Sequence, residues 1–330
     1  MTDRPASTTG AEVTPEHARE ALGRVRREIA KVVVGQDGVV TGIVTALLVR
    51  GHVLLEGVPG VAKTLLATSC AAALDLDTRR VQFTPDLMPA DVTGQRVLEA
   101  DGRSFAFRHG PVFTNLLVAD EINRTPPRTQ AALLESMQER QVSVDGIAQA
   151  LPDPFLVVAT QNPIEYEGTY PLPEAQLDRF LFKLTVGYPD VAQERDVVTR
   201  HHHGMDPHDL DALGLEAVAT AEDLLAARRA VDAIEVEERV IGYLVDLVRA
   251  TRESPSVVLG VSPRGATMLL RAAKAWAFLA GRTFVTPDEV KAVALPTLRH
   301  RLQLRPEVEL EGGTSDGVLR GLLDSVAVPR

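Results

Sequence analysis

The sequence predicts an α/β domain with a parallel sheet and helices on both faces, followed by a smaller, all-helical domain. Short apolar runs typical of buried strands alternate with amphipathic helical segments between residues 14 and 189. Two segments, 95–108 and 141–151, alternate about an Asp-Gly pair and are expected to form hairpin insertions. Beyond residue 189 almost every segment has helical periodicity, so we expect a helical domain over 190–330.

Length, net charge and cysteine content limit the classes of protein to which the chain can belong. The 330 residues suffice for one large domain and one smaller domain. A net charge of −10, without a dense Lys/Arg run, argues against nucleic acid as the main partner. Cys70 is the only cysteine, which excludes an intrachain disulfide and favours a reducing compartment. No apolar run reaches membrane-spanning length, and residues 1–13 are small and polar, so we expect a flexible tail and a cytoplasmic protein.

Local signals place the elements in order along the chain. Thr14-Pro15 has the form of a helix start, because proline is favoured at the first helical position, and this helix is expected to run through Ile29. An extended segment at 32–36 leads to a second amphipathic helix that buries apolar residues from Val39 to Leu48. The expected strands are 53–56, 80–83, 116–119, 155–159 and 180–186. The remaining helices are expected at 63–74, 126–137, around 175, 191–203, 221–230, 237–251, 263–281 and 287–298, with a proline-containing connection at 84–94.

The stretch Val53–Thr64 has the form of a strand, a phosphate-binding loop and a helix start. Two glycines let the backbone turn tightly, so that successive N–H groups and the positive helix end face a phosphate chain. Lys63 is expected to reach the β- and γ-phosphates, and the Thr64 hydroxyl to ligate Mg²⁺. The predicted nucleotide-binding residues of the loop are Gly57, Val58, Pro59, Gly60, Val61, Ala62, Lys63 and Thr64.

Ala62 departs from the usual pattern G-x-x-x-x-G-K-[ST], which has glycine before the lysine. Alanine fits at this position if the residue already has helical dihedrals, because only a positive φ strictly requires glycine. For the loop taken alone, an ordinary Gly/Pro turn between a strand and a helix is the competing interpretation.

Polar residues end two of the other expected strands. Asp120 and Glu121 follow four apolar residues, and Asn162 ends the next buried strand along the chain. Because ligands bind at the carboxyl ends of parallel strands, we expect Asp120 to hold Mg²⁺, Glu121 to polarise an attacking water and Asn162 to orient that water. The competing interpretations are a solvated acidic strand end and an Asx-turn before Pro163.

Two arginines are candidates for contacts with the γ-phosphate. Arg264 begins a helix of the second domain, from which its guanidinium could close onto that phosphate and report its loss as a domain motion. Arg179 lies just before the last strand and could reach a neighbouring subunit's nucleotide as an arginine finger in trans. Surface salt bridges are the competing interpretation for both residues.

Two further features have simpler interpretations. The histidines His201, His202, His203 and His208 lack an acidic or cysteine partner set, so a solvated surface is favoured over a metal site. Cys70 follows the phosphate loop on an apolar helix and is expected to be a small core residue rather than a nucleophile.

Four stretches of the sequence resemble the MoxR family of AAA+ ATPases, namely Gly57–Thr64, Asp120–Pro127, Asn162–Glu165 and Glu167–Phe180. The last two stretches are highly specific, and alanine before the loop lysine is common in this family. The resemblance covers nearly the whole chain, from about Val34 to Leu298.

The resemblance implies an AAA+ α/β domain with a helical lid, usually assembled as a homo-hexameric ring that takes ATP and Mg²⁺. It implies that Gly35 and Gln36 lie against the adenine. It also implies that Asn162 is the first sensor, Arg264 the second sensor and Arg179 the arginine finger.

The main hypothesis is an ATP-hydrolysing, ring-forming chaperone that remodels or activates a client protein complex. The resemblance implies a partner with a von Willebrand factor A domain, and it makes Arg124 a candidate at the subunit interface. A nucleic-acid-stimulated motor of the related helicase branch is one alternative, against which the acidic net charge argues. A nucleotide-sensing scaffold without turnover is another, against which the Asp120-Glu121 pair and the two arginines argue.

Overall fold

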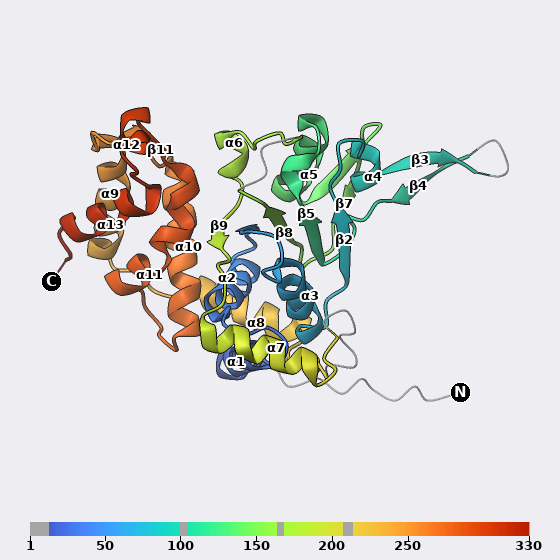
Figure 1. Cartoon of the computed structure of the whole chain (residues 1–330), viewed down its shortest axis with the longest axis horizontal. Helices are drawn as coiled ribbons and strands as arrows, with labels where there is room; N and C mark the ends of the chain where they lie inside the picture. The colour runs from blue at the N-terminus through green and yellow to red at the C-terminus, as the bar shows by residue number, and fades with distance from the viewer. Residues whose placement is uncertain (1–12, 100–103, 164–167, 207–213, 330) are drawn as a thin grey trace, which may run out of the picture.

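A five-stranded, all-parallel sheet forms the centre of the molecule, with the strand order β2-β5-β8-β1-β9 (Figure 1). The computed structural model describes residues 13–99, 104–163, 168–206 and 214–329. The strands of the sheet are β1 (Val53–Glu56), β2 (Thr78–Gln82), β5 (Leu116–Asp120), β8 (Leu156–Gln161) and β9 (Phe182–Thr185). The helices around it are α1 (Pro15–Ile29), α2 (Asp37–Leu48), α3 (Lys63–Ala73), α4 (Pro89–Thr93), η1 (Ile122–Arg124), α5 (Pro127–Glu139) and α6 (Glu174–Leu177). The predicted parallel sheet is therefore confirmed.

Neighbouring residues of the central strands point to opposite faces of the sheet and enter two separate hydrophobic cores. Leu116 and Val118 of β5 face one core, whereas Leu117 and Ala119 face the other. Helices α1, α2 and α3 cover the first face, and α5 covers the second. Because both faces are covered, these strands consist of nearly continuous apolar residues, as is typical of parallel sheets.

Two antiparallel hairpins extend from this domain, as the sequence predicts (Figure 1). One hairpin pairs β3 (Gly94–Leu98) with β4 (Phe105–His109), and the other pairs β6 (Gln141–Val144) with β7 (Ile147–Ala150). The turn expected at Asp101-Gly102 lies outside the described residues.

The connection at 84–94 contains a short helix, α4, that the sequence analysis did not predict. Pro89 occupies its first helical position, and the Asp91 carboxylate accepts a hydrogen bond from the Met88 backbone N–H at 2.8 Å. Proline in this segment therefore starts a helix turn rather than only interrupting structure.

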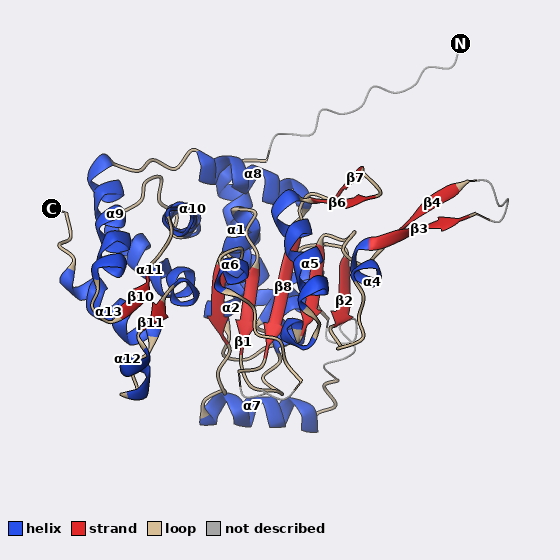
Figure 2. Cartoon of the chain, turned by 90° about the horizontal axis from the view of Figure 1, so that it is seen from above, coloured by secondary structure: helices blue, strands red, loops and turns tan. Residues whose placement is uncertain are grey.

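The chain after residue 189 is almost entirely helical (Figure 2). It also contains a short antiparallel ribbon of β10 and β11, which the sequence analysis did not predict. Strands of three and two residues are too short to produce a periodic signal. None of the described helices is long and apolar enough to cross a membrane. The elements of this part are α7 (Val191–His202), α8 (Ala221–Asp232), α9 (Glu238–Glu253), β10 (Val257–Leu259), α10 (Pro263–Leu279), α11 (Pro287–Leu298), η2 (Arg299–Arg301), β11 (Gln303–Leu304), α12 (Pro306–Leu310) and α13 (Ser315–Ser325).

One hydrophobic core extends without a break from the sheet into the helical part. Helix α8 packs on α1 and α2, and its Arg228 guanidinium donates to the Leu47 carbonyl oxygen from two nitrogens, at 3.0 and 3.1 Å. Helix α10 packs on α2 and α8, whereas α9, α12 and α13 lie at one side of the molecule (Figure 1). The division of the chain at residue 189 stays a prediction.

His52 connects three elements of the α/β domain as a buried, neutral side chain. Its Nδ1 accepts a hydrogen bond from the Val157 N–H of β8 at 3.0 Å, and its Nε2 lies 3.1 Å from the Met137 carbonyl oxygen of α5. Burial, together with the positive charge of Arg140, lowers the pKa of His52 to about 4, while the hydrogen bond with Met137 opposes the shift.

We expect acidification to destabilise the fold through His52. The unfolded chain takes up a proton near pH 6.5, whereas the folded protein keeps His52 neutral down to about pH 4. The stabilisation is therefore complete above pH 6.5 and is lost as the pH falls through this window. Between pH 7 and pH 4.5 the loss is about 2.4 kcal/mol of unfolding free energy, which urea titrations at the two pH values measure.

His52→Gln is the matched variant for this measurement. Its amide can accept from Val157 and donate to Met137, but it does not titrate. The extra loss of unfolding free energy at pH 4.5 should be largely absent in this variant. Equal losses in the variant and the wild type would show that His52 is not the responsible group.

Candidate active site

The loop from Gly57 to Ala62 joins the end of β1 to the start of α3 at the carboxyl edge of the sheet. Its two glycines are required for different reasons. A Cβ atom at position 57 would lie 2.4 Å from the Val186 carbonyl oxygen, and Gly60 has a φ of +82°. The tight turn expected from the sequence is therefore present.

Ala62 has φ 60° and ψ 28°, which is the left-handed region. The expectation that helical dihedrals allow alanine at this position is wrong. A Cβ in this region costs roughly 1–2 kcal/mol, so the loop holds a strained residue directly before Lys63. The Ala62 carbonyl accepts a hydrogen bond from Leu66 N–H at 2.9 Å, so this residue also forms the boundary of α3.

A cavity of about 750 Å³ lies beside the loop and brings together most of the predicted nucleotide-binding residues. One end is polar and contains the carboxylates of Asp120 and Glu121. The predicted residues that line the cavity are Gln36, Pro59, Gly60, Val61, Ala62, Lys63, Thr64, Asp120, Glu121 and Asn162. Such a volume with one apolar and one polar end fits a nucleoside triphosphate.

The apolar end of the cavity lies between the 32–36 segment and helix α7. Gly35 has a φ of +76°, and a Cβ on it would lie 2.3 Å from Oε1 of Gln193, so glycine allows α7 to approach. Arg200 of α7 donates to the carbonyl oxygens of Lys31 at 2.5 Å and Ala30 at 3.4 Å. The side chains at this end are Val32, Val33, Val34, Val197, His201 and Met205.

The buried Asp120 carboxylate is the centre of the polar end. It accepts hydrogen bonds from the Thr64 hydroxyl at 3.1 and 3.2 Å and from the Thr160 hydroxyl at 3.2 Å. Two oxygens that share one octahedral Mg²⁺ at about 2.1 Å are themselves about 3 Å apart. The Thr64 hydroxyl and the Asp120 carboxylate therefore fit the expected Mg²⁺ site. Arg80 of β2 adds an ion pair with Asp120 at 2.6 Å.

Glu121 follows β5 in a left-handed conformation with a φ of 57°. Its backbone N–H donates to the Thr160 hydroxyl at 3.0 Å, which fixes the direction of the side chain. The carboxylate accepts from Gln82 Nε2 at 2.5 Å and lies 3.2 Å from Nε of Arg124. Arg124, a candidate at the subunit interface, thus contacts the predicted catalytic base of its own chain.

Lys63 and Asn162 complete the polar end of the cavity. The Lys63 ammonium donates to the carbonyl oxygens of Gly57, Val58 at 3.3 Å and Gln161 at 3.5 Å. Asn162 is buried directly after β8 and lines the same cavity. Both residues therefore line the same end of the cavity as Asp120 and Glu121.

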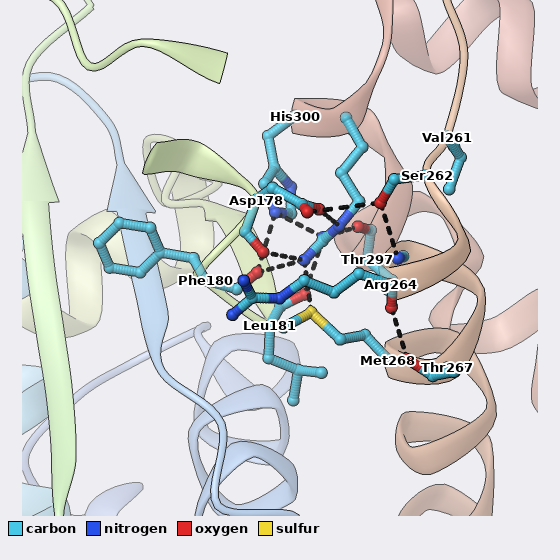
Figure 3. Close-up of polar contacts among 12 residues, drawn as sticks. Asp178, Phe180, Leu181, Val261, Ser262, Arg264, Thr267, Met268, Thr297 and His300 are labelled. Carbon is cyan, nitrogen blue, oxygen red and sulfur yellow. Dashed lines mark hydrogen bonds and ion pairs between the residues drawn. The ribbon is translucent and has the colours of Figure 1, made fainter. Parts of the chain in front are cut away.

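Arg179 and Arg264 do not line this cavity. Arg179 is half-buried after α6, and among the described residues its side chain makes no ion pair or hydrogen bond. Arg264 is exposed at the start of α10, and Figure 3 shows its side chain extending towards Phe180 and Leu181. The structure therefore separates these two arginines from the loop of their own chain.

Several residues of the site were not predicted from the sequence. Arg80 and Gln82 alternate on β2, and this period of two directs both side chains towards the acidic pair on β5. Thr160 was visible only as the end of an apolar strand. His201 is exposed, as expected for a solvated surface, and it also lines the apolar end of the cavity, which α7 crosses.

Comparisons with known proteins agree with this geometry. The sequence model described as "ATPase family associated with various cellular activities (AAA)" matches residues 52–182, and that of the AAA lid domain matches residues 249–321. Chaperone MoxR1 of Mycobacterium tuberculosis is 42% identical over 94% of this chain and 82% of its own length. Uncharacterized protein YeaC of Bacillus subtilis is 46% identical over 95% of this chain and 97% of its own length.

A solved structure of a provisionally assigned ATPase from Cytophaga hutchinsonii has the same fold. It is 39% identical in sequence, with a TM-score of 0.87, and the match covers 96% of this chain and 97% of that one. Together with the phosphate-binding loop and the acidic strand end, these similarities show that the chain belongs to the MoxR family of AAA+ ATPases.

Proposed function

We propose that this protein hydrolyses ATP in a homo-hexameric ring and uses the energy to remodel a client protein. The observation that carries the proposal is the convergence of Thr64, Asp120 and Glu121 beside one phosphate-binding loop. Membership of an ATPase family supports the same reaction. Binding without turnover would not need Glu121, whose proposed role lies only in the attack of water.

The predicted residues of the polar end have separate roles in the proposed hydrolysis. The loop N–H groups and Lys63 bind the phosphates, and Thr64 with Asp120 would hold Mg²⁺. When bound, Mg²⁺ neutralises the charge on the β- and γ-phosphates. Glu121 orients the attacking water and accepts its proton, while the Asn162 amide keeps that water in line.

Arg179 is proposed to act on a neighbouring subunit, and Arg264 on the nucleotide of its own chain. Arg179 lies outside its own cavity, so a ring is the arrangement in which it reaches a γ-phosphate. Arg264 stands on α10 and would approach the nucleotide when the lid closes.

The hairpin β3–β4 is the proposed client contact. Leu98 and Phe105 face each other across its two strands and are 55% and 57% exposed. Apolar side chains on a projecting arm are typical of sites that bind other proteins. In this proposal a partner with a von Willebrand factor A domain delivers the client, as the family resemblance suggests.

Glu121→Gln is expected to bind ATP but not to hydrolyse it. The amide cannot accept the proton of the attacking water, so kcat should fall by about 100-fold or more. Phosphate release measures kcat, and a fluorescent ATP analogue measures the dissociation constant, which should change little. Glu139→Gln, an exposed carboxylate on α5, is the control and should behave as the wild type. Undiminished hydrolysis by Glu121→Gln would remove Glu121 as the base.

Arg179→Ala should lose hydrolysis and regain it in mixed rings. A ring made of Arg179→Ala and Glu121→Gln subunits contains some sites with an intact Glu121 facing an intact Arg179. Its activity should therefore exceed that of either pure ring, whereas pure Arg179→Ala should be slower than the wild type by about 1,000-fold or more. Mixtures without recovered activity would contradict action in trans.

Client capture should depend on the hairpin. Glu121→Gln protein loaded with ATP and immobilised should retain a client from an extract of its own cells, because the ring cannot complete its cycle. Replacing Phe105 with Ser should reduce the amount retained, while Leu310→Ser, at an exposed site on α12, should not. Equal retention by both variants would exclude the hairpin as the contact.

A further inference from the structure

Arg301 places a guanidinium in a buried position between the lid and the α/β domain. Its side chain is only 1% exposed. Nε donates to Oδ1 of Asp178 at 2.7 Å, and Nη1 donates to the carbonyl oxygen of Thr297 in the lid. The guanidinium thus donates both to α11 of the lid, through Thr297, and to the segment before β9, through Asp178.

The same guanidinium holds the backbone on both sides of Arg179. Nη2 donates to the carbonyl oxygen of Asp178 at 3.2 Å and to that of Phe180 at 2.5 Å. Nη1 lies 3.3 Å from the Leu181 carbonyl oxygen. Arg179 itself is therefore held through its flanking peptide groups, whereas among the described residues its side chain makes no hydrogen bond in this network.

The contact also reaches the first turn of α10, which carries Arg264. The second oxygen of the Asp178 carboxylate accepts from the Ser262 hydroxyl at 3.3 Å, and that hydroxyl caps α10 by accepting from Gly265 N–H at 3.1 Å. A Cβ on Gly265 would lie 2.9 Å from Cδ of Arg301. Helix α10 and the segment 178–181 are therefore both packed against the side chain of Arg301.

The chemistry of this contact is specific to arginine. Burial lowers the pKa of Arg301 to about 10 while Asp178 opposes the shift, so the group is charged at neutral pH. The planar guanidinium donates in several directions at once, which a lysine ammonium on a flexible stem does not reproduce at the same sites. The guanidinium therefore holds its acceptor groups in fixed directions, in addition to supplying a positive charge.

We propose that Arg301 is a positioning residue for hydrolysis in the neighbouring subunit. By binding Asp178 and the carbonyl groups on both sides of Arg179, it holds Arg179 in the direction needed to reach the neighbour's γ-phosphate. Through Ser262 and Gly265 it also couples that direction to the position of α10. The inference rests on the proposed function, in which Arg179 acts in trans.

The test measures hydrolysis by pure and mixed rings of full-length protein. Arg301→Met keeps an apolar stem but removes the donors, and kcat should fall by about tenfold or more while the dissociation constant for ATP stays within about twofold. Mixing Arg301→Met with Glu121→Gln subunits should restore hydrolysis, because the Glu121→Gln subunit presents an intact Arg179 to an intact neighbouring site. A loss of activity caused only by poor folding would not be restored by mixing.

Two further variants complete the experiment. The double variant Arg179→Ala/Arg301→Met should hydrolyse ATP at the rate of Arg179→Ala alone, because Arg301 acts only through Arg179. Arg299→Met is the matched control: Arg299 is in the same turn and binds Asp316 at 3.0 Å and the Thr185 hydroxyl at 2.8 Å, away from Arg179. Its kcat should stay at the wild-type value.

The outcomes separate this inference from the proposed function. The inference is overturned if the Arg301→Met variant folds and hydrolyses ATP at the wild-type rate. It is also overturned if mixing with Glu121→Gln subunits does not restore the hydrolysis that Arg301→Met has lost. If Arg179→Ala itself keeps the wild-type rate, the arginine finger and the proposed function fail first. Should Arg301→Met not fold, Asp178→Asn replaces it, because that side chain is 23% exposed and the amide keeps the shape. Mixing with Glu121→Gln subunits must then restore the ATP hydrolysis that Asp178→Asn has lost, and a mixture without restored hydrolysis overturns the inference.

Discussion

The buried carboxylate of Asp120 is the interaction on which the site depends. It joins α3 through Thr64, β8 through Thr160 and β2 through Arg80, so three neighbouring strands and one helix meet on two oxygen atoms. A buried carboxylate is stable only when such groups satisfy it. The order of the strands brings them there, because β5 lies between β2 and β8.

The features that could be predicted from the sequence are those determined by neighbouring residues. The turn between Gly57 and Thr64 follows from its glycines, and the position of Asp120 follows from the apolar run before it. The parallel sheet follows from strands that alternate with helices. In each case the signal lies within about a dozen residues, as periodicity and capping require.

The features that could not be predicted depend on residues that are distant along the chain. Arg80 is 40 positions from Asp120, and Arg301 is 123 positions from Asp178, so no local pattern connects either pair. The left-handed conformation of Ala62 also escaped prediction, because its side chain favours helical dihedrals and the surrounding loop overrides that preference. The position of the exposed His201 beside the cavity could not be predicted either, because only the packing of α7 brings it there.

The unbroken core between the sheet and the lid limits how the molecule can move. A wide hinge opening at α8 or α10 would expose the apolar side chains that these helices share with α2. Sliding of packed helices by small distances keeps those side chains covered. Nucleotide-dependent motion in this chain is therefore expected to be shear, amplified only at parts that stand clear of the core, such as the arm formed by β3 and β4.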